Sequence, residues 1–377
     1  MNLSFSFILA FFCIVGALIA FSLPIFKFLD NDIQPNRANR LDGMRFYLAS
    51  FVIFHHMDCA YSYFTTGQWA PISQWLLIMG KNGVALFFMT TAYLFWGKIR
   101  DKDNIDWIDL YKKRLLRIVP LTFFCSFLAI SLLFIFTEKI PFTATTISNL
   151  LTWFDGGLWD NKLPVTAFHT PFIVLAGVTW TLKWEWMFYF SLPLLFILNK
   201  RSMELSIVLF AFSFYFLPSF TNTAYLWSYF FAGMLCKELK ERVILSKTTA
   251  NCILLSTILL AYLSAPTLYS PPETAFLAII FFCIISGAEL FGALTTRAAK
   301  RLGAISYSLY LTQGLVLFPV YNYLASAKMI AIGPLLLSIL IIAFFAICLL
   351  STFTYHFIEL PFIKKIKTNS PSSLHEI

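Results

Sequence analysis

Charged residues are scarce in this sequence. Asp, Glu, Lys and Arg make up only 12% of its 377 residues, whereas 59% are hydrophobic. A soluble domain has roughly a quarter of its residues charged. With a mean hydropathy of +0.75, this composition excludes an ordinary soluble protein and indicates a polytopic membrane protein. The 43 Phe and 10 Trp suit surfaces that face lipid and the membrane interface.

Several catalytic and metal-binding motifs are also missing. The chain has no Walker loop, no G-x-S-x-G, no H-E-x-x-H and no Rossmann fingerprint. Its seven cysteines are odd in number, form no C-x-x-C pair, and mostly lie inside apolar runs, as buried thiols do. Hydrolase, ATPase and dehydrogenase functions therefore have no support, and neither a metal site nor a disulfide framework is predicted.

Long apolar runs are what the chain does contain. They predict an all-α fold, a polytopic membrane helix bundle with about 10 or 11 transmembrane helices. The first run has neither a basic n-region nor a small-residue cleavage site, so we expect a retained helix and not a signal peptide. The runs lie near 4–27, 43–62, 83–98, 118–137, 184–199, 205–217, 223–237, 250–266, 275–293, 303–325 and 333–357.

The basic residues between these runs predict the orientation. Cytoplasmic loops are enriched in Lys and Arg. If the chain starts outside the cell, nearly all of its 28 basic residues fall on the cytoplasmic side. The outer side then keeps only Lys81, Lys139, Lys162, Lys183 and Lys328. We therefore predict an outer N-terminus and a cytoplasmic C-terminus, and the net charge of +9 needs no nucleic-acid partner.

Arg45 and His56 form the most informative pair in the chain. Eleven residues of α-helix return to nearly the same face, about 16 Å further along the axis. The residues between them are mostly apolar, so the pair places a cation at the cytoplasmic edge and an imidazole near the middle of the membrane. A titratable group at that depth is a functional candidate. His56 is a possible general base, although a packing role is about as common, and Arg45 alone is typical of an interfacial anchor. His55 lies about 100° away on the helix.

A second cluster of cations follows in the segment 111–120. Arg114 and Arg117 are three residues apart at the cytoplasmic end of a predicted helix, so they share a face. Arginine suits bidentate contacts with phosphate, which predicts a docking point for a phosphorylated cofactor. Anionic lipid is an equally good partner for this cluster.

An acidic residue opens another predicted helix. Glu185 lies in the segment 177–189, two residues after Lys183 and shortly after Trp180. Its carboxylate could bind an acceptor hydroxyl, orient a base or pair with an arginine. The alternative is a charge that simply stabilises the N-terminus of the helix.

The segment 138–183 is too long for a simple connection and is expected outside the cell. Aromatic rings beside acids suit sugar binding, because a ring covers the C–H face of a sugar while carboxylates accept from its hydroxyls. An interfacial segment that lies on lipid is equally compatible. The residues concerned are Trp153, Phe154, Asp155, Trp159, Asp160, His169 and Trp180.

Taken together and in order, six segments resemble the acyltransferase-3 family of integral membrane acyltransferases. The stretch 41–45 followed by His56 is similar to the family's basic residue, ten residues, then His. The other segments are similar to G-V-D-L-F-F-x-x-S-G-F, R-x-x-R-I-x-P, W-S-L-x-x-E-x-x-F-Y, S-Y-S-x-Y-L and I-E-x-P-F. They lie at 83–93, 114–120, 180–189, 306–311 and 358–362, so the resemblance spans nearly the whole chain.

The chain departs from the family pattern at four places. Ala85 replaces the usual Asp, and Thr91 and Ala92 replace Ser-Gly. Gln313 stands where the family often has His, which puts a second catalytic His in doubt. The helix before Asp42 is an addition, since such chains often begin near this motif.

The resemblance implies a division of the chain and a function. Residues 1–40 would be an extra transmembrane helix and cytoplasmic linker, 41–367 the membrane acyltransferase domain, and 368–377 a disordered cytoplasmic tail. The function implied is an inner-membrane O-acetyltransferase that moves acetyl from cytoplasmic acetyl-CoA to a bacterial surface polysaccharide or its lipid-linked precursor. A polysaccharide or lipid-intermediate transporter, and a scaffold in a polysaccharide assembly complex, are the alternatives.

The resemblance also assigns roles to residues. His56 and Arg45 would be catalytic, while Arg114 and Arg117 would bind acetyl-CoA. Glu185, Trp180 and Tyr307 would bind substrate, which is a carbohydrate or lipid-linked glycan.

Overall fold

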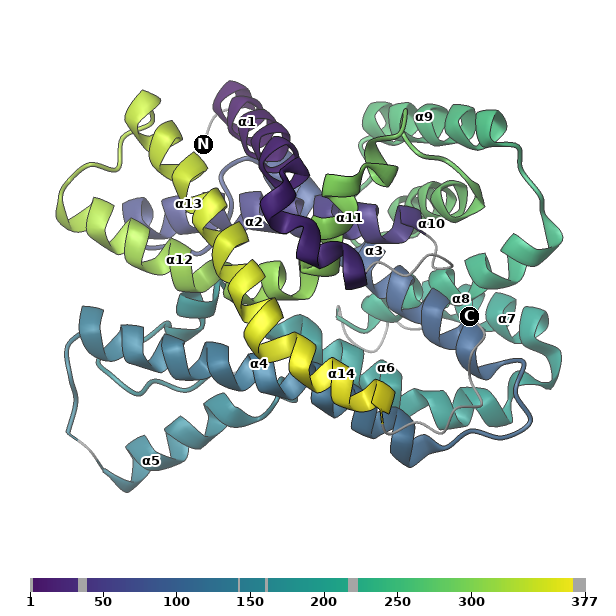
Figure 1. The fold of residues 1–377 in the computed structure, drawn as a ribbon, viewed down its shortest axis with the longest axis horizontal. Helices are drawn as coiled ribbons and strands as arrows, with labels where there is room; N and C mark the ends of the chain where they lie inside the picture. The colour runs from purple at the N-terminus through teal and green to yellow at the C-terminus, as the bar shows by residue number, and fades with distance from the viewer. Residues whose placement is uncertain (1–2, 33–38, 142, 160–161, 216–222, 369–377) are drawn as a thin grey trace.

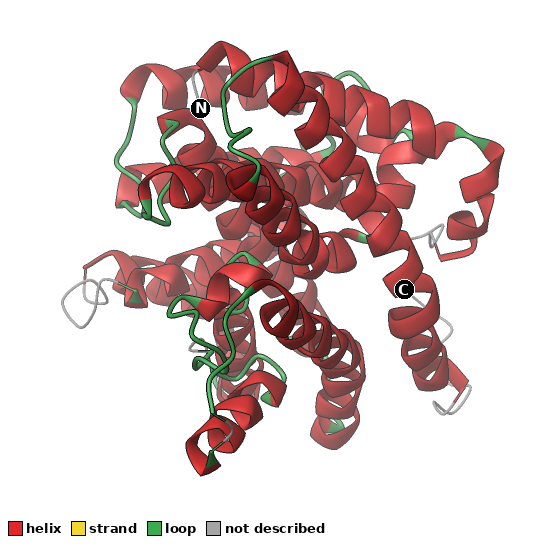
Figure 2. Ribbon diagram, turned by 90° about the vertical axis from the view of Figure 1, so that its left-hand side faces the viewer, coloured by secondary structure: helices red, strands yellow, loops and turns green. Residues whose placement is uncertain are grey.

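The structure, a computed structural model, is a bundle of helices without strands among the residues it describes (Figures 1 and 2). It describes the whole chain except residues 1–2, 33–38, 142, 160–161, 216–222 and 369–377. The helices are α1 (Leu3–Ser22), α2 (Asn39–Thr66), α3 (Gln74–Ile99), α4 (Trp107–Phe136), α5 (Ala144–Leu151), α6 (Trp180–Ile197), α7 (Ser202–Tyr215), α8 (Trp227–Arg242), α9 (Lys247–Ser264), α10 (Pro271–Ser286), α11 (Arg297–Ala304), α12 (Ser306–Ser326), α13 (Pro334–Thr354) and α14 (Leu360–Thr368). Short 3₁₀ turns join several of them, and a π-helical turn, Tyr355–Glu359, joins α13 to α14.

The predicted all-α, polytopic membrane fold is confirmed. Every apolar run expected to span the membrane overlaps a helix. By length and composition, five helical stretches of the described chain qualify as spans, and a sixth does if α11 and α12, which meet at a 69° bend, count as one. α2 does not qualify although it has 28 residues, because polar side chains such as His55, His56 and Asp58 keep its mean hydropathy too low.

Polar residues fix where several helices begin. Ser73 accepts a hydrogen bond from the backbone N–H of Leu76 at the start of α3. Asp106 does the same for Asp109 at the start of α4. Each cap satisfies an N–H that the first turn of a helix leaves unpaired. These caps fix the residues at which α3 and α4 begin.

α2 lies between two hydrophobic cores. Leu48 and Val52 pack into the larger core, which α3, α4, α6, α8 and α10 share. Phe46 and Phe54 pack into the second core, which is formed with α1, α12 and α13. In Figure 1, α1 crosses near α11 and α13, and both are in contact with it. The helix that carries Arg45 and His56 is therefore held from both sides.

Two glycines permit close backbone approaches beside this helix. A Cβ on Gly43 would lie 1.9 Å from the carbonyl oxygen of Leu294, so α2 meets the turn before α11 without room for a side chain. A Cβ on Gly314 would lie 2.4 Å from the backbone nitrogen of Ala176. Backbone contact of this kind requires glycine. The second approach brings the segment 171–177, which is predicted to lie on the outer side, against α12.

Candidate active site

Three helices run between two polar centres of the molecule. α2 carries Arg45 at one centre and His56 at the other. α6 likewise carries Glu185 at the first centre and Trp180 at the second. α12 carries Tyr307 at the first centre and Tyr310 at the second. The residues nearer the predicted outer side line a cavity, and the others form a cluster of charges. Each of the three helices therefore contributes one of these residues to the cavity and one to the cluster.

The cavity has a volume of about 400 Å³ and lies where α2, α3, α6 and α12 meet segments predicted to lie on the outer side. It includes two predicted site residues, His56 and Trp180. The 14 residues that line it are Val52, His55, His56, Trp69, Gly80, Lys81, Val84, Phe172, Ala176, Gly177, Thr179, Trp180, Tyr269 and Tyr310. An aromatic-walled cavity with a few polar groups is typical of a binding site for a small ligand or part of a larger one.

His56 is held in one orientation by Gln313. The Nε2 of Gln313 donates to the carbonyl oxygen of Tyr310 at 2.8 Å, which leaves the amide oxygen Oε1 to face the imidazole. Nδ1 of His56 lies 2.9 Å from that oxygen. Since an amide oxygen only accepts, Nδ1 carries the proton and Nε2 keeps its lone pair. Nε2 is therefore the nitrogen available as a base in the cavity.

His55 also lines the cavity, but its ring is used differently. Its Nδ1 donates to the carbonyl oxygen of Leu76 at 3.2 Å, and its Nε2 lies 3.6 Å from the Sγ of Cys59. Both nitrogens are thus engaged by the protein. The choice of His56, made from the helical face that it shares with Arg45, stays a prediction that these contacts favour.

The charged cluster is built around Glu185. Its carboxylate accepts from the hydroxyl of Tyr189 at 3.3 Å and, at 3.5 Å, from that of Thr91. Thr91 thus keeps a hydroxyl where the family pattern has Ser. Electrostatic interactions also connect Glu185 with the arginines that the sequence singled out, which are Arg45, Arg114 and Arg117. The structure therefore brings together residues from α2, α4 and α6 that lie up to 140 positions apart.

The three arginines have different partners. Arg117 forms an ion pair with the buried Glu359 at 3.1 Å and lies over the ring of Tyr307, 5.6 Å from its centroid. Arg45 lies 3.9 Å from Asp42 on its own helix. Arg114 lies over the ring of Phe95 at 4.9 Å, and its Nε has no hydrogen-bond partner in the described part of the chain. Of the three, Arg114 retains an unused donor.

Glu359 is a site residue that sequence reasoning recorded only as part of a motif. It lies in the π-helical turn, a feature often found at functional sites. Besides Arg117, its carboxylate accepts from the hydroxyl of Ser308 at 3.1 Å, so it connects α4 with α12. Trp69 and Lys81 are cavity residues that no sequence motif marks, and Tyr310 is a cavity residue that the sequence marks only as part of the 306–311 motif.

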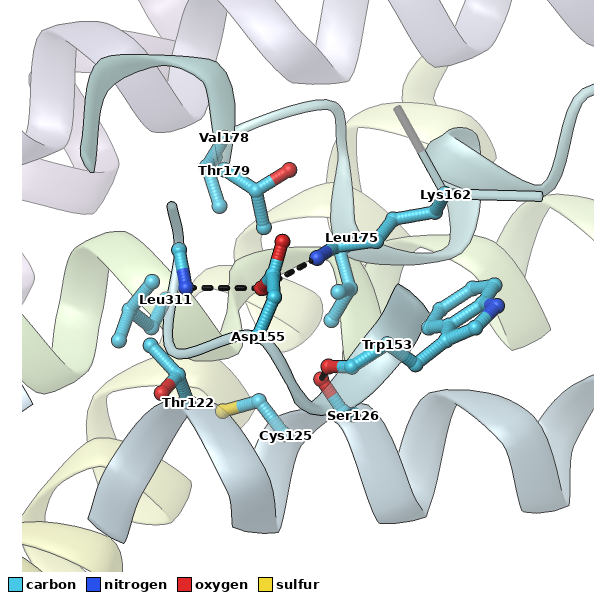
Figure 3. Close-up of a pocket in the computed structure, with 11 residues that line it drawn as sticks. Thr122, Cys125, Ser126, Trp153, Asp155, Lys162, Leu175, Val178, Thr179 and Leu311 are labelled. Atoms are coloured by element: carbon cyan, nitrogen blue, oxygen red, sulfur yellow. Dashed lines mark hydrogen bonds and ion pairs between the residues drawn. The ribbon is translucent and has the colours of Figure 1, made fainter. Parts of the chain in front are cut away.

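The predicted outer segment 138–183 folds on itself instead of presenting all of its acids and aromatics to a ligand (Figure 3). The ammonium group of Lys162 forms a buried ion pair with Asp155 at 2.7 Å and donates to the carbonyl oxygen of Thr152 at 2.9 Å. Trp153 is buried, and its indole N–H donates to the carbonyl oxygen of Leu163. These residues stabilise the segment itself, so the expectation that they bind sugar loses its support.

The rest of that segment divides into two groups. Phe172 and Trp180 line the cavity, so the segment does contribute an aromatic wall. Trp159 and His169 are exposed, Phe154 is at the surface, and Asp160 lies outside the described residues. A second cavity beneath the segment, with Thr122, Cys125 and Ser126 on its α4 side, has only about 10 Å³, close to the space of one water molecule (Figure 3).

Comparison with known protein families identifies the family of this chain. A family model described as an acyltransferase domain, Acyl_transf_3, matches residues 38–353. The chain belongs to the acyltransferase-3 family. No curated protein matches it significantly, and neither does any solved structure. The family predicted from the six motifs is thus confirmed, and the acyltransferase-3 protein described here is a multi-pass membrane acyltransferase.

Proposed function

We propose that this acyltransferase moves acetyl from cytoplasmic acetyl-CoA to a sugar hydroxyl of a bacterial surface polysaccharide, such as lipopolysaccharide O-antigen, capsule or exopolysaccharide, or of its lipid-linked precursor. It would act in the inner membrane, with its N-terminus outside and its C-terminus in the cytoplasm. One observation carries the proposal. The same three helices, α2, α6 and α12, reach both an arginine-rich cluster and an aromatic cavity that contains a histidine.

The arginine cluster supports a phosphorylated donor. Arg114 has a buried N–H without a hydrogen-bond partner among the described residues, and Arg45 and Arg117 lie near it around Glu185. Guanidinium groups bind phosphates in bidentate fashion. Arg45 and His56 are separated by about 16 Å of helix, a gap that the pantetheine arm of acetyl-CoA would cross to bring its thioester to the cavity.

The cavity supports the chemistry. An acceptor hydroxyl beside His56 would give its proton to Nε2, and its oxygen would attack the thioester carbonyl carbon. The C–S bond would then break, acetyl would stay on the sugar oxygen, and the CoA thiolate would take up the proton. Positioned base catalysis of this kind contributes about 10²–10⁴-fold in rate. Gln313 supports this role by holding the proton on Nδ1.

The aromatic walls support a sugar acceptor. Trp69 and Trp180 offer large faces in the cavity that suit the C–H face of a pyranose ring. Membership of an acyltransferase family favours acyl transfer over both the transporter and the scaffold. A transporter needs neither a base beside the acceptor nor affinity for CoA, so both properties separate these functions experimentally.

Transfer of radiolabelled acetyl from acetyl-CoA to surface polysaccharide in membranes tests the proposal. Wild type is compared with His56→Ala and with His55→Ala at matched protein levels. His55→Ala is the control because it removes the neighbouring imidazole from the same cavity. We expect labelling in wild type, labelling in His55→Ala above a tenth of it, and loss by about 10²–10⁴-fold in His56→Ala. Equal labelling in all three would remove His56 from the mechanism, and no labelling in wild type would overturn acetyl transfer from CoA.

A further inference from the structure

Lys81 is the only Lys, Arg, Asp or Glu among the residues that line the 400 Å³ cavity. It belongs to α3, next to Gly80, where α2 and α3 pack so closely that a Cβ on Gly80 would lie 2.5 Å from the Cβ of His55. This crossing places Lys81 in the same cavity as His56. The sequence motifs that identify the family do not include Lys81, and the proposed acyl transfer gives it no role.

The ammonium group of Lys81 is not neutralised by contact with an acid. It lies over the ring of Tyr269, 4.5 Å from the centroid. No carboxylate in the described chain forms an ion pair with it. Glu273 is the acid that interacts with it at longer range. The Oε2 of Glu273 accepts from the hydroxyl of Tyr229 at 2.6 Å and from the backbone N–H of Tyr269 at 2.7 Å, while its Oε1 has no hydrogen-bond partner among the described residues.

A cation in such a cavity favours a negatively charged ligand. Partial burial beside the Tyr269 ring removes water from the ammonium group, and the ring face returns only part of that solvation energy. A carboxylate or phosphate on the ligand would supply the missing partner, and it would meet no acidic side chain in the cavity lining. A neutral sugar would leave the ammonium group of Lys81 without an anionic partner.

We infer that the acceptor of this enzyme is an anionic glycan, and that Lys81 binds its carboxylate or phosphate while a hydroxyl of the same glycan meets His56. The inference rests on the proposed acyl transfer and adds the chemical class of the acceptor. Lys81 would determine specificity without entering the chemistry, so its loss would raise KM for the acceptor and leave kcat nearly unchanged.

The test uses the purified full-length protein and oligosaccharides released from the surface polysaccharide of the cells that produce it. They are supplied untreated, carboxyl-reduced, and dephosphorylated with hydrofluoric acid, so that the two sources of charge are separated. Lys81→Met is compared with Lys81→Arg and with Lys139→Met, which removes an exposed lysine outside the cavity. Acetyl transfer gives KM and kcat, and quenching of tryptophan fluorescence without acetyl-CoA gives binding, since Trp69 and Trp180 line the cavity.

We expect Lys81→Met to weaken binding and raise KM for the untreated acceptor by about 10- to 100-fold, the usual value of a charged hydrogen bond. Lys81→Arg and Lys139→Met should stay within a few-fold of wild type. The effect of Lys81→Met should vanish with whichever treatment removes the anion. An unchanged KM in Lys81→Met, or an equal rise with every acceptor form, would overturn the inference.

Two further outcomes separate the inference from the function on which it rests. Binding that depends on Lys81 without any acetyl transfer would support the anion site and reject the proposed acetyl transfer. Transfer that does not depend on Lys81 would support the proposed function and reject the anionic acceptor.

Discussion

At the scale of single residues, the most consequential contact joins His56 to Gln313. A general base needs its lone pair on the nitrogen that faces the substrate, and a neutral imidazole has two tautomers. Gln313 selects one of them because its own Nε2 is committed to the carbonyl of Tyr310. Gln313 touches no reacting atom in this mechanism, so it is a positioning residue.

Replacing Gln313 should therefore lower kcat more than it changes KM for the acceptor. We expect Gln313→Leu to lose about 10- to 100-fold in kcat, as is typical when a group that orients an imidazole is removed. Gln313→His, which restores a nitrogen able to accept from Nδ1, should recover most of the loss. The measurement is acetyl transfer at saturating donor, with melting temperature as a check on folding. Equal activity in both variants would leave Gln313 a packing role only.

Arg117 and Glu359 pose a second question at this scale, because their ion pair could stabilise the fold, bind the donor, or do both. Glu359→Leu leaves the partly buried guanidinium of Arg117 without its partner, which costs at most about 3–5 kcal/mol, the cost found for fully buried pairs. Replacing both, with Arg117→Met, should restore much of the thermal stability. If Arg117 also binds the phosphates of acetyl-CoA, the double variant should regain stability but not the KM for acetyl-CoA. Recovery of both would make the pair purely structural.

At the scale of elements, α1 is attached to the rest of the bundle by hydrogen bonds and not by packing alone. The buried guanidinium of Arg301 donates to the carbonyl oxygens of Phe21 at 2.7 Å and Leu23 at 3.1 Å, at the end of α1. It also donates twice to Asp30, at 2.8 and 2.9 Å. The last carbonyls of a helix have no partner within it. One side chain of α11 thus satisfies the end of α1 and the segment that follows.

The hydrogen bonds from Arg301 and Arg297 hold the pKa of the Asp30 carboxyl well below its usual range. Because the folded pKa is lower than the unfolded value of about 3.9, the interaction stabilises the fold above that value and is lost as pH falls through the folded pKa. Asp30→Asn should therefore melt at lower temperature than wild type, with a constant difference from about pH 5 to 8 that narrows below about pH 4. Asp103→Asn, an exposed acid, is the control. Equal melting of Asp30→Asn and wild type at pH 7 would contradict the role of Arg301.

The helices and loops also show which parts of the structure could be predicted from the sequence. Apolar runs located the helices, because hydrophobic length and helical span are tied together in a membrane. The segment 138–183 was harder, because composition does not show whether a polar group meets a ligand or another part of the chain. Asp155 and Trp153 have the composition of a sugar site, yet they bind Lys162 and Leu163. The contact between His56 and Gln313 joins positions 257 residues apart, beyond any local pattern.

At the scale of the whole molecule, the two polar centres are expected to lie toward opposite sides of the membrane. The arginines that gather around Glu185 belong to helix ends expected in the cytoplasm, and the cavity borders segments expected outside. Acyl transfer from a cytoplasmic donor to an outer acceptor needs this order. The opposite orientation would place the arginine cluster away from acetyl-CoA, so the topology is a condition of the proposed function.

The topology can be tested with two exposed positions of one chain. Trp159, which is 65% exposed, is predicted to lie outside, and Ile244, which is 91% exposed in the turn between α8 and α9, is predicted to lie in the cytoplasm. Six of the seven cysteines are buried, so Cys252→Ser gives a background in which single cysteines at these positions can be labelled. A membrane-impermeant maleimide should label Trp159→Cys in intact cells and Ile244→Cys only after the membrane is permeabilised. The reverse pattern would exclude a cytoplasmic donor at the arginine cluster, because that cluster would then face a compartment without acetyl-CoA.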